Sequence, residues 1–221
     1  MSRGRTDPAA EGGTIGVDES GKGDYFGPLV VAAVWVPSGG REVLAELGVR
    51  DSKTVSDRRA HELARSVKEA YPTVVVAIGP ERYNALHASM RNLNRLLAWA
   101  HARAIEDLLG RVPSCEEAIS DQFGDRRLLE QALLERGRRV RLVQRPRAEA
   151  DPVVAAASLV ARAEFLRRLA ALADRFGVPL PKGAGPPVLA AARGFVARHG
   201  AAELRKVAKV HFRTTAQLRE G

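Results

Sequence analysis

The stretch "IGVDESGKGDYFGPLVVAAVWV", Ile15 to Val36, joins two apolar runs through a loop that contains three glycines. The first run is long enough for a short strand, and the second is apolar enough to be buried on both faces. Because the connection is short, we expect the two strands to pair antiparallel in one sheet. Two adjacent acids, Asp18 and Glu19, close the first strand immediately before the loop.

The loop itself has features of a ligand-binding turn. Alternate residues of a strand face opposite ways, so Asp18 and Glu19 can face one site only if the chain leaves regular strand geometry, which Gly21 and Gly23 allow. Bare glycine backbone can approach a ligand closely, and Lys22 can contact a phosphate. The triplet is too short for a P-loop, and alone it is also typical of a tight hairpin turn.

Outside this stretch, the sequence alternates helices and strands. It predicts a mixed α/β domain of about five strands flanked by helices, with a helical carboxy-terminal region. Trp35 and Trp99 are expected in its core. Further strands are expected at 73–80, 116–123 and 139–145, and helices at 55–72 (capped by Ser56), 83–109, 125–137 and 152–177.

Composition limits the class of protein. A length of 221 residues suits one domain, here 14–221, after a short tail, 1–13, that we expect to be disordered. The formal charge of +9 makes a polyanionic partner plausible, although a basic soluble protein would carry the same charge. The single cysteine, Cys115, fits a reducing compartment, and no apolar run is long enough to span a membrane, so we expect a cytoplasmic protein.

Further acids stand where strands end. Asp121 ends the strand expected within 116–123, while Glu149 and Asp151 lie between the last strand and the helix at 152–177. Strand ends are where α/β proteins gather site residues, and grouped carboxylates repel one another unless cations neutralise them. Oxygen ligands of this kind suit Mg²⁺ or Mn²⁺. Each acid taken alone is more often a helix cap or a surface charge.

A family resemblance emerges from these motifs. The segment "GVDESGKGDYFGPLVVAAV" strongly resembles the opening motif of the type 2 ribonucleases H, in the Gly-Lys-Gly form of ribonuclease HIII; ribonuclease HII usually has Gly-Arg-Gly there. The resemblance extends in order over residues 14–215. Its other segments are "DSKTVSD" (51–57), the YN-xx-H and NLN-xx-LAW pattern within 83–109, "SDQF" (120–123), "RAEADPVVAAASLVAR" (147–162), "LPKGAG" (180–185) and "AKVHF" (208–212).

The resemblance implies a ribonuclease H-like fold and hydrolysis of the RNA strand of RNA–DNA hybrids, leaving 3′-hydroxyl and 5′-phosphate ends. It implies two Mg²⁺ or Mn²⁺ ions held by Asp18, Glu19, Asp121 and Glu149. It also implies a partner that is the hybrid duplex, with neither a membrane nor an obligate protein partner, and we expect a monomer. The alternatives are incision at single ribonucleotides in duplex DNA, as in ribonuclease HII, and hybrid binding without catalysis.

Substrate contacts follow the same resemblance. The backbone of Gly21, Lys22 and Gly23 is expected to recognise the 2′-hydroxyl that distinguishes RNA from DNA. Ser52, Lys53 and Lys182 are further candidates for the substrate backbone. Lys206 and Lys209 could also hold phosphates, although each taken alone is more often a solvated charge.

Two departures from the family pattern concern the amino terminus and the fourth acid. Ribonuclease HIII commonly carries an amino-terminal substrate-binding domain, and only about a dozen residues precede Ile15 here. Near the fourth acid the chain looks one residue short, so Glu149 and Asp151 compete for that role. Asp151 stands directly before Pro152, at an expected helix start, where aspartate is a usual cap. Glu149 is neither at the cap nor on an apolar face, and we favour it as the ligand.

Overall fold

The computed structural model describes residues 12–49 and 55–218. These residues fall into two compact units. The first is drawn from Met1–Glu19, Val31–Val76 and Asn92–Ala163, and the second from Ser20–Val30, Ala77–Arg91 and Glu164–Gly221. The division into a tail, 1–13, and one domain, 14–221, stays a prediction.

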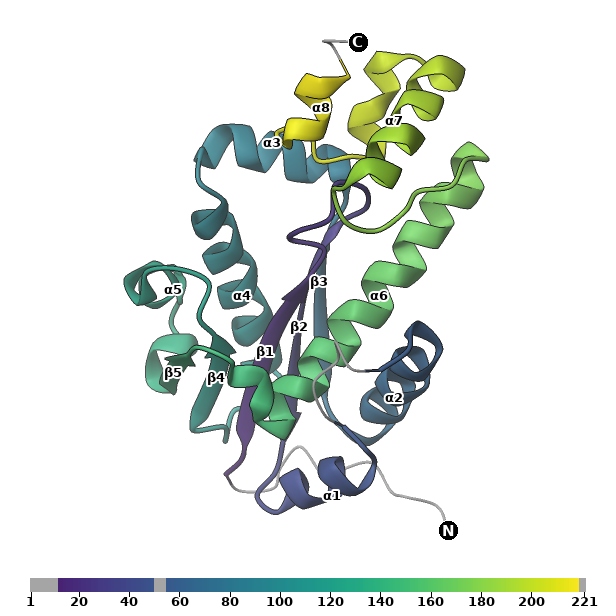
Figure 1. The fold of residues 1–221 in the computed structure, drawn as a ribbon. Helices are drawn as coiled ribbons and strands as arrows, with labels where there is room; N and C mark the ends of the chain where they lie inside the picture. The colour runs from purple at the N-terminus through teal and green to yellow at the C-terminus, as the bar shows by residue number, and fades with distance from the viewer. Residues whose placement is uncertain (1–11, 50–54, 219–221) are drawn as a thin grey trace. The chain divides into compact units, whose positions relative to one another are not determined.

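Most of a five-stranded sheet belongs to the first unit, and its strand order is β3-β2-β1-β4-β5 (Figure 1). The apolar run of β2 is buried along its whole length. β1 pairs parallel with β4, and β4 pairs parallel with β5, with Val17 opposite Ser120 and Asp121 opposite Arg145. Parallel strands end at the same edge, so the residues that close β1, β4 and β5 come together there. The strands are β1 (Thr14–Ser20), β2 (Leu29–Val36), β3 (Thr73–Ile78), β4 (Glu117–Asp121) and β5 (Arg141–Arg145).

Helices cover both faces of this sheet, as the sequence predicts. Figure 1 shows α4 and α5 on one side and α2 with the first half of α6 on the other. The start of α6 lies so close to β1 that a Cβ atom on Gly16 would be 2.3 Å from the carbonyl oxygen of Val153, which explains the glycine. The elements are α1 (Gly40–Glu46), α2 (Asp57–Ala70), α4 (Leu93–Leu109), α5 (Arg126–Ala132), η2 (Gly137–Arg139), η3 (Ala148–Ala150) and α6 (Pro152–Phe176).

The single helix predicted over 83–109 is wrong. The segment forms two helices, α3 (Pro80–Met90) in the second unit and α4 in the first. Arg91 adopts left-handed backbone geometry with φ of 51°, and the Asn92 side chain accepts hydrogen bonds from the backbone N–H groups of Asn94 and Arg95. An asparagine cap within an apolar stripe therefore starts a new helix.

The second unit is mostly helical and packs around the loop that follows β1. Tyr25 and Phe26 of this loop are fully buried, and Phe26 forms an antiparallel bridge with Ala208. The unit contains α3, the second half of α6, α7 (Pro186–His199), η4 (Ala201–Lys206) and α8 (Arg213–Gln217). The helical carboxy-terminal region is thus as predicted.

Two of the remaining predictions concern burial and membranes. Trp35 is fully buried, as expected, whereas Trp99 is 40% exposed, so its assignment to the core is wrong. Trp99 lies on the outer face of α4, away from the buried positions Leu97 and Ala100. Within residues 12–49 and 55–218, the helices include none that is long and apolar enough to cross a membrane.

Candidate active site

The acids predicted from the sequence stand at the carboxyl edge of the parallel strands. Asp18 and Glu19 are among the last three residues of β1, and Asp121 is the last residue of β4. Glu149 follows β5 and lies in the single turn η3. All four belong to the first unit. The topology therefore brings to one edge residues that are more than a hundred positions apart in the sequence.

Asp18 is buried and has two acidic neighbours, Glu19 and Asp121. The pKa of Asp18 is raised to about 7, first by burial, then by the negative charge of Glu19 and less by that of Asp121. A hydrogen bond from Ser158 and the backbone N–H of Glu19, 2.8 Å from Asp18 Oδ1, oppose this rise. A nearby cation stabilises the ionised form of a buried carboxyl that lies among like charges.

A buried histidine, His101 of α4, contacts Glu19. Its Nε2 atom lies 3.2 Å from Glu19 Oε2, and its Nδ1 atom lies 3.2 Å from the hydroxyl oxygen of Ser120. The Ser120 hydroxyl donates to the carbonyl oxygen of Asp121 at 3.0 Å, and the Phe123 ring packs edge-on against the imidazole. His101 thus links the end of β1 to the end of β4.

From the sequence, His101 is expected to be a structural or exposed residue of a helix and not part of the site. The signal that could have found it is its place in the apolar stripe of α4, four residues after Leu97 and four before Ile105, both fully buried. A histidine at a core position needs polar partners for both ring nitrogens. In this fold, the Glu19 carboxylate and the Ser120 hydroxyl, both at strand ends, supply them.

Asp121 supports the turn that carries Glu149. Its Oδ1 atom accepts a hydrogen bond from the backbone N–H of Ala148 at 3.0 Å. The preceding residue, Arg147, has left-handed geometry with φ of 55°, which turns the chain sharply after β5. Asp121 is thus hydrogen-bonded to the residue that directly precedes Glu149.

Asp151 has a complete set of structural contacts. Its Oδ1 atom accepts from the backbone N–H of Val153 at 3.0 Å, so it caps α6. Its carboxylate also pairs with Arg41 at 3.3 Å and with Arg145 at 3.2 Å. These contacts occupy the side chain in ways that need no metal.

The donor set fits a hard divalent cation in its chemistry. The acids offer carboxylate oxygens, and the raised pKa of Asp18 reflects charge that a cation would neutralise. In the part of the chain that the structure describes, no three His, Cys, Asp or Glu side chains converge closely enough to hold an ion. Oxygens of Glu19 and Asp121 instead contact His101 and the Ala148 N–H group.

The Gly-Lys-Gly loop belongs to the second unit. Gly21 has φ of 88°, and a Cβ atom there would be 2.2 Å from the carbonyl oxygen of Pro28, so only glycine fits. A Cβ atom on Gly23 would meet no atom within 4 Å, so that backbone faces open space. Lys22 between them is half-buried.

The loop that carries Lys182 is bound to this turn. Asp24 Oδ1 accepts a hydrogen bond from Gly183 N–H at 2.6 Å, and Tyr25 N–H donates to the Gly183 carbonyl oxygen at 2.8 Å. The structure therefore places Lys182, which is exposed, one residue from the anchor of the Gly-Lys-Gly loop. Ser52 and Lys53 lie outside the described residues.

The two further lysines proposed to hold phosphates, Lys206 and Lys209, differ in their surroundings. Lys206 pairs with Glu203 at 2.7 Å on the surface. Lys209 is fully buried, and its ammonium donates to backbone carbonyl oxygens. The prediction that Lys209 contacts a phosphate is therefore wrong.

Comparison with known proteins agrees with this geometry. A family model described as Ribonuclease HII matches residues 15–215. The chain is 46% identical over 202 residues to ribonuclease HIII of Chlamydia muridarum, covering 90% of this chain and 67% of the relative. It is 42% identical over 200 residues to ribonuclease HIII of Protochlamydia amoebophila, covering 90% and 66%. The chain thus spans about two thirds of the length of these relatives.

Solved structures give the same result. The structure of Bst-RNase HIII in complex with Mn²⁺ matches with a TM-score of 0.87 at 34% identity, covering 96% of this chain and 70% of that one. Ribonuclease HII of Archaeoglobus fulgidus, solved in complex with PCNA, matches with a TM-score of 0.77 at 30% identity, covering 94% and 97%. The predicted ribonuclease H-like fold is confirmed.

Proposed function

Because the chain belongs to the ribonuclease HII family, we propose that it hydrolyses the RNA strand of RNA–DNA hybrids and leaves 3′-hydroxyl and 5′-phosphate ends. The observation that carries the proposal is the position of Asp18, whose pKa is raised by burial and by two neighbouring acids at the carboxyl edge of the parallel strands. The curated relatives with 42–46% identity are named ribonuclease HIII, which favours continuous hybrids as the substrate.

Asp18, Glu19, Asp121 and Glu149 would hold the metal, Mg²⁺ or Mn²⁺, and we expect two ions. Bound there, such ions would supply a Lewis acid that activates a water molecule and stabilises the leaving 3′ oxygen. The protein's own part is to place these four acids on strand ends and one short turn at one edge of the sheet. The Mn²⁺ complex of Bst-RNase HIII supports this assignment.

The exposed backbone at Gly23, together with that of Gly21 and Lys22, would recognise the 2′-hydroxyl of RNA. A 2′-hydroxyl can donate to a carbonyl and accept from an N–H group, which a rigid glycine turn can offer without side-chain obstruction. Lys182 is exposed and would contact the phosphate backbone, as would Ser52 and Lys53. These contacts give affinity without sequence preference.

We also expect a monomer without an obligate protein partner. The one thiol, Cys115, is buried, and burial raises its pKa, which favours the inert protonated form expected of a protein in the reducing cytoplasm. Light scattering on the purified protein would test the monomer.

One assay on three duplexes tests the function. The purified protein, with Mg²⁺ or Mn²⁺, should cut a continuous RNA–DNA hybrid, cut poorly at a lone ribonucleotide in DNA, and leave plain DNA intact. Asp18→Asn should abolish cleavage and retain binding. Efficient incision at the lone ribonucleotide would favour the ribonuclease HII alternative, and cleavage in excess chelator would contradict the metal mechanism.

A further inference from the structure

One segment of the first unit carries a strong excess of positive charge. Residues 125–147, which contain α5, η2 and β5, hold eight arginines and three acids, a net +5 of the chain's +9. All eight arginines are exposed. We call the surface that these side chains cover, around α5, η2 and the edge strand β5, the arginine-rich face; the residues are Arg126, Arg127, Arg136, Arg138, Arg139, Arg141, Arg145 and Arg147.

Ion pairs neutralise only part of this charge. Arg126 pairs with Glu130, Arg139 with Glu135, Arg141 with Glu117 and Arg145 with Asp151. Within the described residues, Arg127 and Arg136 have no ion pair. The pairs of Arg126 and Arg139 lie on exposed side chains, where such contacts exchange readily with a competing anion.

Buried contacts fix the backbone beneath this face. Glu106 of α4 is 5% exposed, and its carboxylate accepts from the backbone N–H groups of Leu134 at 2.7 Å and Gly137 at 2.8 Å. Asp125 caps α5 by accepting from Arg127 N–H, and the Arg138 guanidinium donates to the Leu133 carbonyl oxygen at 3.0 Å. The arginines therefore stand on an ordered support, and binding would cost mainly side-chain ordering.

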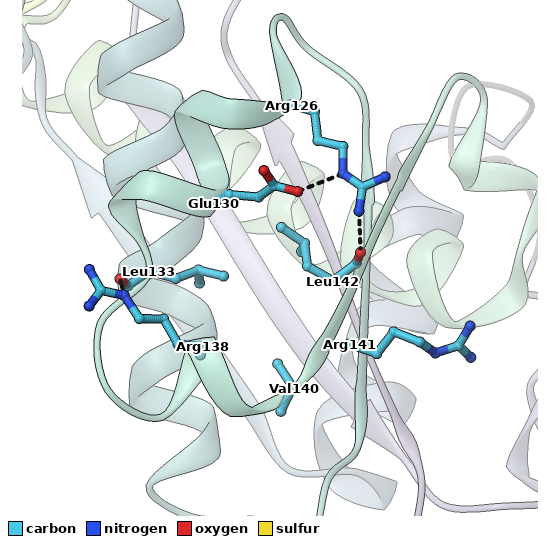
Figure 2. A pocket seen from close by; sticks show the side chains of 8 residues that line it. Arg126, Glu130, Leu133, Arg138, Val140, Arg141 and Leu142 are labelled. Carbon is cyan, nitrogen blue, oxygen red and sulfur yellow. Dashed lines mark hydrogen bonds and ion pairs between the residues drawn. The ribbon is translucent and has the colours of Figure 1, made fainter.

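The arrangement suits an extended anion and not a small one. A cavity of about 320 Å³ lies between α5 and β5. Figure 2 shows that the guanidinium groups of Arg138 and Arg141, which line it, point away from each other. The Arg126 guanidinium is held by Glu130 and by the Leu142 carbonyl oxygen. A site for one phosphate needs converging donors, whereas a nucleic-acid backbone presents charges along a line.

We propose that the arginine-rich face binds the phosphate backbone of a nucleic-acid duplex outside the catalytic centre. The inference rests on the proposed function in one respect only, that the protein works on nucleic acid. Arg141 and Arg145 lie on the same side of β5, about 13 Å apart at the usual strand rise, so they can reach phosphates that are not adjacent. Contacts of this kind add affinity for any duplex and carry no sequence information.

The test removes charge from the face without touching the acids. In the variant Arg127→Gln/Arg136→Gln/Arg139→Gln, two arginines without an ion pair and one surface-paired arginine are neutralised. The matched control, Arg58→Gln/Arg65→Gln/Lys68→Gln, removes the same charge from exposed positions of α2 in the same unit, where Arg58 pairs with Glu62. Binding is measured by fluorescence anisotropy in EDTA, without turnover, on a hybrid and on a DNA duplex of about 24 base pairs.

The face variant should bind both duplexes on the order of tenfold more weakly at low salt, and the slope of log affinity against log salt should become shallower by about one to three. The control should change much less. Equal losses in the two variants would overturn the proposal in favour of bulk charge, and no loss would leave the arginines as a guard against strand pairing at the sheet edge. Because no cleavage is scored, either result is independent of the proposed reaction.

Discussion

The ammonium nitrogen of Lys209 lies 2.8 Å from the backbone carbonyl oxygen of Asp24. It also lies 2.8 Å from the carbonyl oxygen of Gly27 and 3.4 Å from that of Phe26, and it sits 5.6 Å above the Tyr83 ring. Lys209 therefore holds the four residues that follow the Gly-Lys-Gly triplet. The "AKVHF" segment, whose function the sequence left open, is the anchor of the loop proposed to recognise RNA.

Replacing Lys209 with methionine should damage that loop. Three carbonyl oxygens would lose a buried donor, which lowers the free energy of unfolding by about 2–4 kcal/mol. Because the loop would be less ordered, we expect KM for the hybrid to rise more than kcat falls. The control is Lys206→Met, which removes a surface lysine paired with Glu203 and should change stability by at most about 0.5 kcal/mol. Urea unfolding and steady-state kinetics measure both effects; equal stability of the two variants would contradict the anchor.

Lys209 should also make stability depend on pH. Burial lowers the pKa of Lys209 to about 7, while the charge of Asp24 opposes the shift. Between this value and its ordinary value of 10.5, the unfolded chain binds the proton and the folded chain does not. The free energy of unfolding therefore gains a contribution that rises with pH across this window.

The comparison of wild type with Lys209→Met isolates that contribution, since other groups titrate in both proteins. The difference in unfolding free energy should increase from pH 7 to pH 10. His211, which stacks on His87 and Tyr83, does not interfere, because burial lowers its pKa to about 4, with help from the charges of His87 and Lys209. A difference that stays constant over the window would show that Lys209 titrates normally.

The fold was predictable because its signals are local. The unbroken apolar run of β2 predicts a strand buried on both faces, and the serine before α2 accepts from Arg59 N–H as a cap. The break at Asn92 was missed because apolar spacing continues from α3 into α4, and only the cap geometry shows two helices.

The candidate site was less predictable because its contacts join distant residues. Asp18 and Asp121 could be placed at strand ends, but the contact of His101 with Glu19 depends on how α4 packs against the sheet. The burial of Lys209 likewise depends on a partner 185 residues away, and a lysine in a polar segment gives no local sign of it. Trp99 is exposed although tryptophan is usually buried.

His101 should act as a positioning residue for Glu19. His101→Ala removes the contact at 3.2 Å, and we expect Mn²⁺ to bind on the order of tenfold more weakly. His101→Gln keeps a side-chain N–H donor and should restore part of the affinity. Mn²⁺ binding is followed by electron paramagnetic resonance, without substrate.

The control for His101 is His61→Ala, at an exposed position of α2. It should leave Mn²⁺ affinity and stability unchanged. Loss of stability in His101→Ala with unaltered Mn²⁺ affinity would show that the histidine only fills the core.

Substitutions should show that Glu149 is a metal ligand and that Asp151 is a helix cap. Glu149→Gln removes a charge from the proposed metal site, so it should abolish most activity while the melting temperature stays the same or rises through relief of carboxylate repulsion. Asp151→Asn keeps a side-chain oxygen for Val153 N–H but loses the charge that faces Arg41 and Arg145. Because asparagine also caps helices well, the Asp151→Asn variant should retain most activity and lose about 1 kcal/mol of stability. Hybrid cleavage and thermal unfolding, measured on the same preparations, compare the two. An inactive Asp151→Asn beside an active Glu149→Gln would reverse the assignment.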